Sequence, residues 1–201
     1  MPVRADFAVL LDACVLAEAS VADLFLRLGE EPRLLLPKWT SRIWDEVDRT
    51  CLLKLGWRAD LVTTRREIAN SFFEEATISG YEHLEVQCHI DADDRHVLAA
   101  AIHAKVETIV TTNLKHFPAE ELSNWGIVSV HPGTYLITLF EHDPGVVVDK
   151  LHRLAKDRNR SIEMVLGRLA WTVPTFTRYV SQQLNLTIPE VTSKQWRTTD
   201  Q

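Results

Sequence analysis

The run Phe7-Ala8-Val9-Leu10-Leu11 is entirely apolar and stops abruptly at Asp12. This pattern is typical of a strand in a parallel sheet, because helices cover both faces and leave no face for alternating polar residues. Three later segments repeat it, namely Leu34-Leu35-Leu36 before Pro37, Thr108-Ile109-Val110 before Thr111, and Gly126 to Val130 before His131. We therefore expect four strands, each closed by a polar residue or a proline.

Segments with apolar residues at helical spacing separate these strands. The spacing predicts helices over about residues 15–28, 41–55, 60–78 and 93–104. Strands that alternate with helices indicate an α/β protein with a mostly parallel sheet covered on both faces. After about residue 131 the strand pattern ends, and we expect helices over residues 133–140, 144–156, 161–170 and 174–184.

Length, composition and charge narrow the class of protein. The 201 residues are 46% hydrophobic and 25% charged, as in an ordinary globular protein that needs no disulfide or structural metal to hold its core. The three cysteines form no Cys-x-x-Cys pair, so we expect a reducing, cytoplasmic setting. Asp6 precedes any long apolar run and no stretch approaches the roughly 20 apolar residues of a membrane helix, so neither export nor membrane insertion is expected. The net charge of −6 argues against nonspecific coating of nucleic acid, although a nuclease remains compatible with it.

Polar residues at the carboxyl ends of the expected strands form a candidate site, because ligands of open parallel sheets bind beyond these ends. Asp12 closes the first strand, and Asn113 follows Thr111 and Thr112 after a later one. Asp93 and Asp94 open an alanine-rich helix. Each has a plain alternative use, since Asp commonly caps helices and Asn commonly occupies turns.

Glu46 lies at the edge of the buried face of the expected helix 41–55, where an unpaired carboxylate is costly. Two carboxylates about 4 Å apart repel by about 4 kcal/mol at an effective dielectric of about 20, so carboxylates that converge on one crevice take up protons or hold a cation. Oxygen ligands favour Mg²⁺ or Mn²⁺ over zinc. Hydrolysis of phosphodiester bonds is the reaction that such a site serves most naturally.

Four motifs, in order along residues 6–132, resemble the PIN-domain ribonucleases, particularly the VapC-like toxins of toxin–antitoxin modules. They are Leu10-Leu11-Asp12-Ala13-Cys14, Trp44-Asp45-Glu46-Val47, Asp93-Asp94-Arg95-His96-Val97, and Val110-Thr111-Thr112-Asn113-Leu114-Lys115-His116-Phe117. The resemblance implies a three-layer PIN-like α/β fold, with a central mostly parallel sheet of about four to five strands flanked by helices. It also implies a PIN-like nuclease domain over residues 1–135, on which a C-terminal helical extension, residues 136–201, is packed.

The resemblance also implies the roles of individual residues. Catalysis and metal binding fall on Asp12, Glu46, Asp94 and Asn113, with Asp93 as an additional ligand; the residues that support these ligands would be Thr111, Thr112, His116 and Ser41. The expected cofactor is Mg²⁺ or Mn²⁺, and the expected activity is that of an endoribonuclease. The expected partners are an RNA substrate and a cognate antitoxin, within a homodimer or a toxin–antitoxin hetero-oligomer. His116 stands where many family members have an Asp, which weakens the case for a second metal ion.

The segment from Lys150 to Arg168 is the most basic part of the chain, with six basic residues against two acidic ones. It is either a solvated helix face or a rim that contacts RNA phosphates beside the site. The candidate rim residues are Lys150, Arg153, Lys156 and Arg160.

Other functions remain open at this point. A noncatalytic PIN-like scaffold that binds RNA or a protein is the main alternative. A phosphohydrolase of the haloacid dehalogenase type needs a second Asp where Cys14 stands, and the charge of Asp12 raises the pKa of a Cys14 nucleophile. A zinc site could use histidines spaced by seven residues, namely His89, His96 and His103.

Overall fold

The computed structural model describes residues 7–190, so Asp6, on which the expectation about export rests, and the end of the expected helical extension lie outside the described residues. A five-stranded sheet with the order β3-β2-β1-β4-β5 forms the centre, and all four neighbouring pairs are parallel. The strands are β1 (Ala8–Leu11), β2 (Leu36–Thr40), β3 (Thr77–Ile78), β4 (Thr108–Val110) and β5 (Val128–Val130). The predicted α/β fold, with a mostly parallel sheet of four to five strands flanked by helices, is confirmed.

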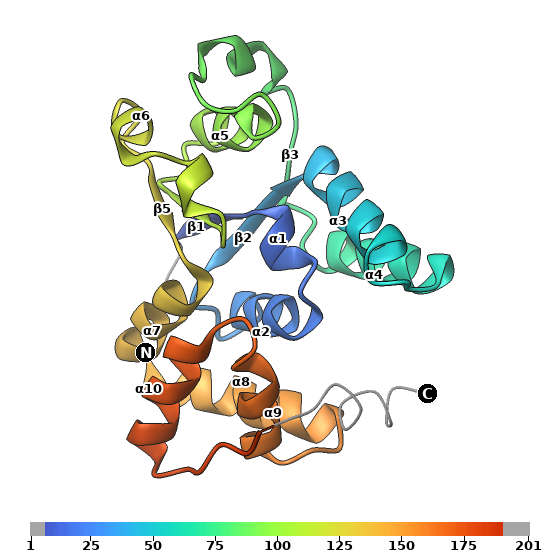
Figure 1. Ribbon diagram of the computed structural model, residues 1–201, viewed down its shortest axis with the longest axis vertical. Helices are drawn as coiled ribbons and strands as arrows, with labels where there is room; N and C mark the ends of the chain where they lie inside the picture. Colours follow the sequence, from blue (N-terminus) through green and yellow to red (C-terminus); the bar gives the residue numbers. More distant parts are fainter. Residues whose placement is uncertain (1–6, 191–201) are drawn as a thin grey trace.

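Helices cover the sheet on both sides, with α5 on one side and α2 on the other (Figure 1). Val9, Leu10 and Leu11 of β1 are fully buried, as the unbroken apolar run predicts. Ala99, Ala100 and Ala101 of α5 are also fully buried. The first part of the chain contains α1 (Ala13–Leu16), α2 (Ala19–Gly29), α3 (Ser41–Leu53), α4 (Ala59–Phe72), η1 (Glu82–Gln87), α5 (Arg95–His103), η2 (Leu114–His116) and α6 (Ala119–Ser123).

Strand β2 (Leu36–Thr40) begins at the last residue of the expected strand, Leu36, and runs through Pro37, so the prediction of a strand over residues 34–36 is wrong except at Leu36. Leu36 N donates to Phe7 O beside β1, and Trp39 N donates to Ala76 O on the opposite side. Because successive residues of a strand address opposite neighbours, Pro37 faces the side of β3. Strand β3 pairs only with Trp39 and Thr40, so the missing N–H of Pro37 breaks no bond of the sheet.

Two expected helices are shorter than their apolar patterns. The pattern over 15–28 is divided between α1 and α2, and the guanidinium of Arg65 donates to the carbonyl of Leu16 at the end of α1. This side-chain partner comes from α4, so nothing local in the sequence indicates the break. The pattern over 60–78 ends at Phe72, and its last two residues form β3 instead.

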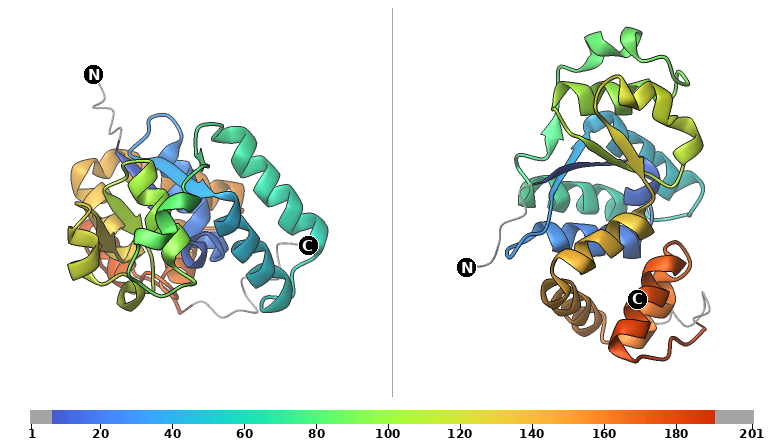
Figure 2. Two further views of the ribbon diagram at one scale, coloured as in Figure 1. Left: turned by 90° about the horizontal axis from the view of Figure 1, so that it is seen from above. Right: turned by 90° about the vertical axis from the view of Figure 1, so that its left-hand side faces the viewer.

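The C-terminal part of the described chain is helical and gathers at one end of the molecule (Figure 2, right). Its helices are α7 (Pro132–His142), α8 (Pro144–Asp157), α9 (Ile162–Leu169) and α10 (Pro174–Leu184). Helix α8 is tied to α2 by ion pairs of Arg27 with Asp157, at 2.8 Å, and of Arg158 with Asp23, at 3.2 Å. The division expected between residues 135 and 136 falls inside α7 and stays a prediction. Within residues 7–190, every helix falls short of the combined length and apolarity that spanning a bilayer requires.

Candidate functional site

The strand order changes direction beside β1. Strand β1 leads to β2 on one side, whereas the chain later crosses from β3 to β4 on the other side. The carboxyl ends of β1 and β4 therefore flank a topological switch point, where open α/β sheets bind ligands. Leu11 is in register with Val110, and Asp12 N donates to Val110 O at 3.1 Å, so the residues that follow both strands meet there.

Asp12 is 6% exposed and has several hydrogen-bond partners. Its Oδ1 accepts from Ala13 N at 2.6 Å, which caps α1. Its Oδ2 accepts from Thr111 Oγ1 at 2.6 Å and from Cys14 Sγ at 3.2 Å. The two uses that the sequence suggests for Asp12, a helix cap and a site carboxylate held by Thr111, are thus compatible in one side chain.

Asp94 precedes α5 and makes no side-chain capping bond. Its Oδ2 lies 2.9 Å from Nδ1 of His116. Burial raises the pKa of Asp94, the hydrogen bond and charge of His116 lower it, and the charges of Asp12 and Asp91 raise it. Asp12 and Asp94 are therefore close enough for the charge of one to act on the ionisation of the other.

Asp12, Asp94 and Asn113 line one hollow of about 390 Å³, together with Ala13, Cys14, Ala17, Glu18, Thr50, Lys54 and Leu55. The backbone N of Asn113 donates a hydrogen bond to Thr111 Oγ1 at 3.0 Å, which fixes the backbone of Asn113 close to the end of β4. The structure thus brings together three of the four residues to which the sequence assigns catalysis and metal binding.

Glu46, the fourth residue, is not among the described residues that line this hollow. Its Oε1 lies 2.9 Å from Nε2 of His96 on α5, two residues after Asp94. The His96 side chain is 1% exposed, and neither of its ring nitrogens has a hydrogen bond of acceptable geometry within residues 7–190. The pair is therefore a close electrostatic contact between α3 and α5, with the carboxylate one-third exposed.

The other predicted ligand and supporting residues divide into two groups. Thr112 N donates to Cys14 Sγ at 3.2 Å, so Thr112 lies beside the hollow with Thr111. Asp93 is exposed, and its N donates to Asp91 Oδ1 in a local turn. Ser41 lines a different hollow, between the ends of β2 and β3, with Arg42. Within the described structure, Asp93 and Ser41 therefore do not belong to the lining of the hollow that holds Asp12.

Lys150 cannot contact RNA, and its assignment to a phosphate-binding rim is wrong. Its side chain is fully buried, and Nζ donates to the carbonyls of Glu30 and Glu31 at 3.1 and 3.2 Å. Burial lowers the pKa of Lys150, and the carboxylate of Glu30 at 3.7 Å raises it. Helical spacing alone cannot distinguish this inward position from an exposed one.

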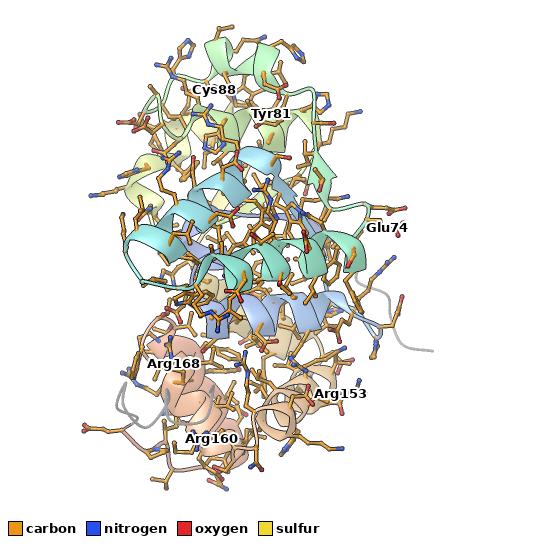
Figure 3. All side chains as sticks on the ribbon, turned by 90° about the vertical axis from the view of Figure 1, so that its right-hand side faces the viewer. Glu74, Tyr81, Cys88, Arg153, Arg160 and Arg168 are labelled. Atoms are coloured by element: carbon orange, nitrogen blue, oxygen red, sulfur yellow. The ribbon has the colours of Figure 1, made fainter. Side chains whose placement is uncertain are left out.

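The remaining rim candidates lie on the helical end of the molecule, where Figure 3 shows Arg153 and Arg160. Arg153 Nε pairs with Asp149 one helical turn away, at 2.9 Å, and Lys156 is exposed. None of these residues is among the described lining of the hollow. Their contact with RNA stays a prediction.

Three polar residues that line the hollow were not predicted from the sequence. Lys54 is the C-cap of α3, Glu18 is the N-cap of α2, and Thr50 lies on the last turn of α3. Lys and Glu are common at helix ends, so only the packing of α3 beside α1 reveals them. Lys54 is the one Lys or Arg among the described residues that line the hollow, and it gives an acidic site a group that attracts phosphate.

The donor atoms limit the metal ion that the site could hold. Within residues 7–190, no group of three or more His, Cys, Asp and Glu side chains is arranged to bind a metal ion. The carboxylates of Asp12 and Asp94 and the carboxamide of Asn113 nevertheless line the hollow, together with the carboxylate of Glu18, and Mg²⁺ is commonly held by one or two carboxylates with water and substrate phosphate. The residues fit such an ion better than a zinc site built from four protein ligands.

Comparison with known proteins finds a relative for part of the chain. Over 58 residues, which are 29% of this chain, the sequence is 47% identical to a Mycobacterium tuberculosis protein named "Putative ribonuclease VapC50". The matched stretch is 34% of the length of that relative. No protein-family model matches the chain, and no solved structure matches it significantly. Part of this chain is therefore similar to a protein named as a ribonuclease of the VapC kind.

Proposed function

We propose that this protein is a Mg²⁺- or Mn²⁺-dependent endoribonuclease of the PIN-like class and the toxin of a toxin–antitoxin pair. The observation that carries the proposal is the meeting of Asp12, Asp94 and Asn113 in one hollow at the switch point of the sheet. The raised pKa of Asp94, to which the charge of Asp12 contributes, supports a site that a bound cation would stabilise. The partial similarity to VapC50 supports RNA as the substrate.

In this proposal, Asp12, Asp94 and Asn113 hold the ion, whereas Asp93, which is exposed and outside the described lining of the hollow, does not. When bound, the ion makes water a stronger nucleophile and offsets charge on the phosphodiester. Thr111 and Cys14 fix the orientation of the Asp12 carboxylate through its Oδ2. Lys54 attracts the phosphate group into an otherwise acidic hollow.

Two further residues position the ligands. Glu46 lies outside the described lining of the hollow, and its contact with His96, two residues after Asp94, holds α3 near the start of α5. His116 orients Asp94 through the contact of its Nδ1 with Oδ2. A carboxylate held by an imidazole in this way is restrained to one rotamer, which favours binding of an ion by reducing the entropy lost.

The central test replaces Asp12 or Asp94 with Asn in the full chain. Each change keeps the size of the side chain and removes the charge, so cleavage of a mixed RNA pool in Mn²⁺ should fall at least about a hundredfold, as when a main electrostatic contact of a transition state is lost. Asp60→Asn is a matched control, because Asp60 is an exposed carboxylate on α4 paired with Arg58. Full activity in Asp12→Asn and Asp94→Asn would remove the metal-site assignment, as would wild-type cleavage that survives a chelator.

The toxin assignment requires a second experiment. If the adjacent upstream reading frame encodes a small protein, co-expression with that protein should suppress both RNA cleavage and growth inhibition, and should change the oligomeric state in size-exclusion chromatography. Cleavage that is indifferent to this protein would favour a nuclease without a cognate antitoxin.

A noncatalytic PIN-like scaffold is the second candidate, and one observation favours it. Glu46 and Asp94 both lie 2.9 Å from histidine nitrogens, His96 and His116, so each carboxylate already has a partner other than a metal ion. Calorimetric titration with Mn²⁺ separates the two functions. RNA binding without Mn²⁺ uptake or cleavage would support the scaffold.

A further inference from the structure

The C-terminal helical part of the chain reaches the edge of the hollow through one ion pair. Glu18, which lines the hollow, accepts from Nη2 of Arg168 at 2.5 Å. Arg168 belongs to α9 and its side chain is 13% exposed, so the contact is largely shielded from water. Figure 3 shows Arg168 on the same side of the molecule as the turn between α3 and α4, which carries Lys54.

Trp171 extends this edge away from the hollow. The guanidinium carbon of Arg168 lies 4.4 Å from the centroid of the Trp171 ring, a close cation–π contact. Trp171 N donates to Arg168 O at 3.3 Å, in the turn that joins α9 to α10. The indole is nonetheless 48% exposed, so a large aromatic surface next to Arg168 is in contact with solvent.

A strand of nucleic acid that places one phosphate in the hollow must continue past its edge. The lining carries three carboxylates, Asp12, Glu18 and Asp94, so the flanking nucleotides find little attraction inside it. Proteins that bind single-stranded nucleic acid combine cationic side chains with aromatic rings on which bases stack. Arg168, which contacts Glu18 and ends the most basic stretch of the chain, and Trp171, which lies against Arg168, supply this combination.

We propose that Arg168 and Trp171 form a stacking platform for a base of single-stranded RNA that flanks the bond to be cleaved. This platform rests on the proposed ribonuclease function and assigns substrate binding to the helical extension. The guanidinium of Arg168 is fixed by its ion pair with Glu18 and by its contact with the indole of Trp171. The same contact restrains the indole, so the exposed surface of the Trp171 ring is preorganised for a base.

The test measures binding of a short fluorescein-labelled single-stranded RNA of mixed sequence to the full chain by fluorescence anisotropy, with a chelator present to prevent cleavage. Trp171→Ala should raise Kd about tenfold, within the range found when a stacking aromatic is removed. Trp171→Phe should restore most of the affinity, because it retains an aromatic face. Phe72→Ala is the matched control, since Phe72 is a 64% exposed aromatic on α4, and it should leave Kd unchanged.

Two further measurements separate stacking from a general loss of structure or of function. A duplex of the same sequence offers no free base, so its Kd should not respond to Trp171→Ala, and the thermal midpoint of that variant should match that of Phe72→Ala. Equal single-strand affinity of wild type and Trp171→Ala, in a protein whose wild type binds and cleaves RNA, would overturn the platform and leave the nuclease intact. In that case the exposed indole of Trp171 would be better explained as a contact surface for a protein partner. A wild type that neither binds nor cleaves RNA would instead overturn the proposed function.

Discussion

At the scale of single residues, Asp12 shows how one side chain serves both the fold and the candidate site. Its Oδ1 caps α1, while Oδ2 accepts hydrogen bonds from Thr111 and Cys14. Thr111 follows β4 and Cys14 lies in α1, so the carboxylate joins two elements that are distant in sequence. A side chain restrained from both ends has few rotamers to lose when it binds a ligand.

Cys14 gives a prediction that does not depend on the proposed function. Burial and then the charge of Asp12 raise the pKa of its thiol to about 11, from a reference value of 9.0. The thiolate is the reactive form, so at about pH 8 the thiolate fraction should be about a hundredfold lower than for an ordinary cysteine. Alkylation by iodoacetamide, followed by peptide mass spectrometry, should be correspondingly slow at Cys14 in the native protein and fast in denaturant.

The same pKa shift makes the free energy of unfolding depend on pH. The folded form keeps the Cys14 proton to higher pH than the unfolded form, so the contribution is complete below about pH 9 and is lost as pH rises toward about 11. Cys88, whose pKa burial also raises to about 11, should behave alike. Native alkylation of Cys14 at the rate of a free thiol would contradict the buried, hydrogen-bonded geometry.

At the scale of elements, continuous apolar runs predict β1 and β4 closely, because a strand buried on both faces imposes that pattern. Strand β3 escapes prediction, since two residues, Thr77–Ile78, carry too little pattern to be distinguished from the end of a helix. The extension of β2 through Pro37 depends on how far its neighbour β3 reaches. Both features depend on contacts between elements that are distant in sequence, so the local sequence pattern does not predict them.

In the candidate site, too, some features could be predicted from the sequence and others depend on packing between elements. The rule that ligands bind beyond the carboxyl ends of parallel strands predicts that Asp12 and Asn113 lie together, and the hollow contains both. The partner of Glu46 could not be predicted, because His96 becomes its neighbour only when α3 packs near α5. The same holds for Lys54, whose place beside Glu18 depends on the packing of α3 against α1.

Lys150 provides a prediction about the contact between α8 and the turn after α2. Its ammonium group donates to the carbonyls of Glu30 and Glu31 while fully buried. Lys150→Met keeps the apolar stem and leaves two carbonyls without a donor, so the free energy of unfolding should fall by about 2 to 4 kcal/mol. Lys156→Met is the control on the same helix, where an exposed side chain should change it by no more than about 0.5 kcal/mol.

Urea denaturation followed by circular dichroism measures both variants. If Lys150→Met were as stable as Lys156→Met, the Lys150 ammonium would contribute nothing to the attachment of α8. A specific loss in Lys150→Met would identify the most basic stretch of the sequence as partly structural, with Lys150 as its internal anchor.

At the scale of the whole molecule, α2 joins the sheet to the C-terminal helices. It packs against β2 and also against α8 and α9, and it buries six residues on a broad face. The ring of Phe25 on α2 stacks on that of Tyr135 on α7, with centroids 6.1 Å apart. The contact between Arg168 and Glu18 then links this helical end to the candidate site.

This arrangement predicts that residues 1–135 do not fold cooperatively alone. A fragment ending there divides α7 and removes α8 and α9, which strips apolar cover from α2 and breaks its ion pairs with Asp157 and Arg158. Exposing buried apolar area costs about 25 cal/mol per Å², so losing even a few hundred Å² would remove much of the stability of a typical domain. Urea unfolding of residues 1–135 should therefore be broad, whereas residues 1–190 should show one sharp transition. A sharp transition in the shorter fragment, at a similar midpoint, would make the helical part an independent appendage and would weaken its assignment to the edge of the active site.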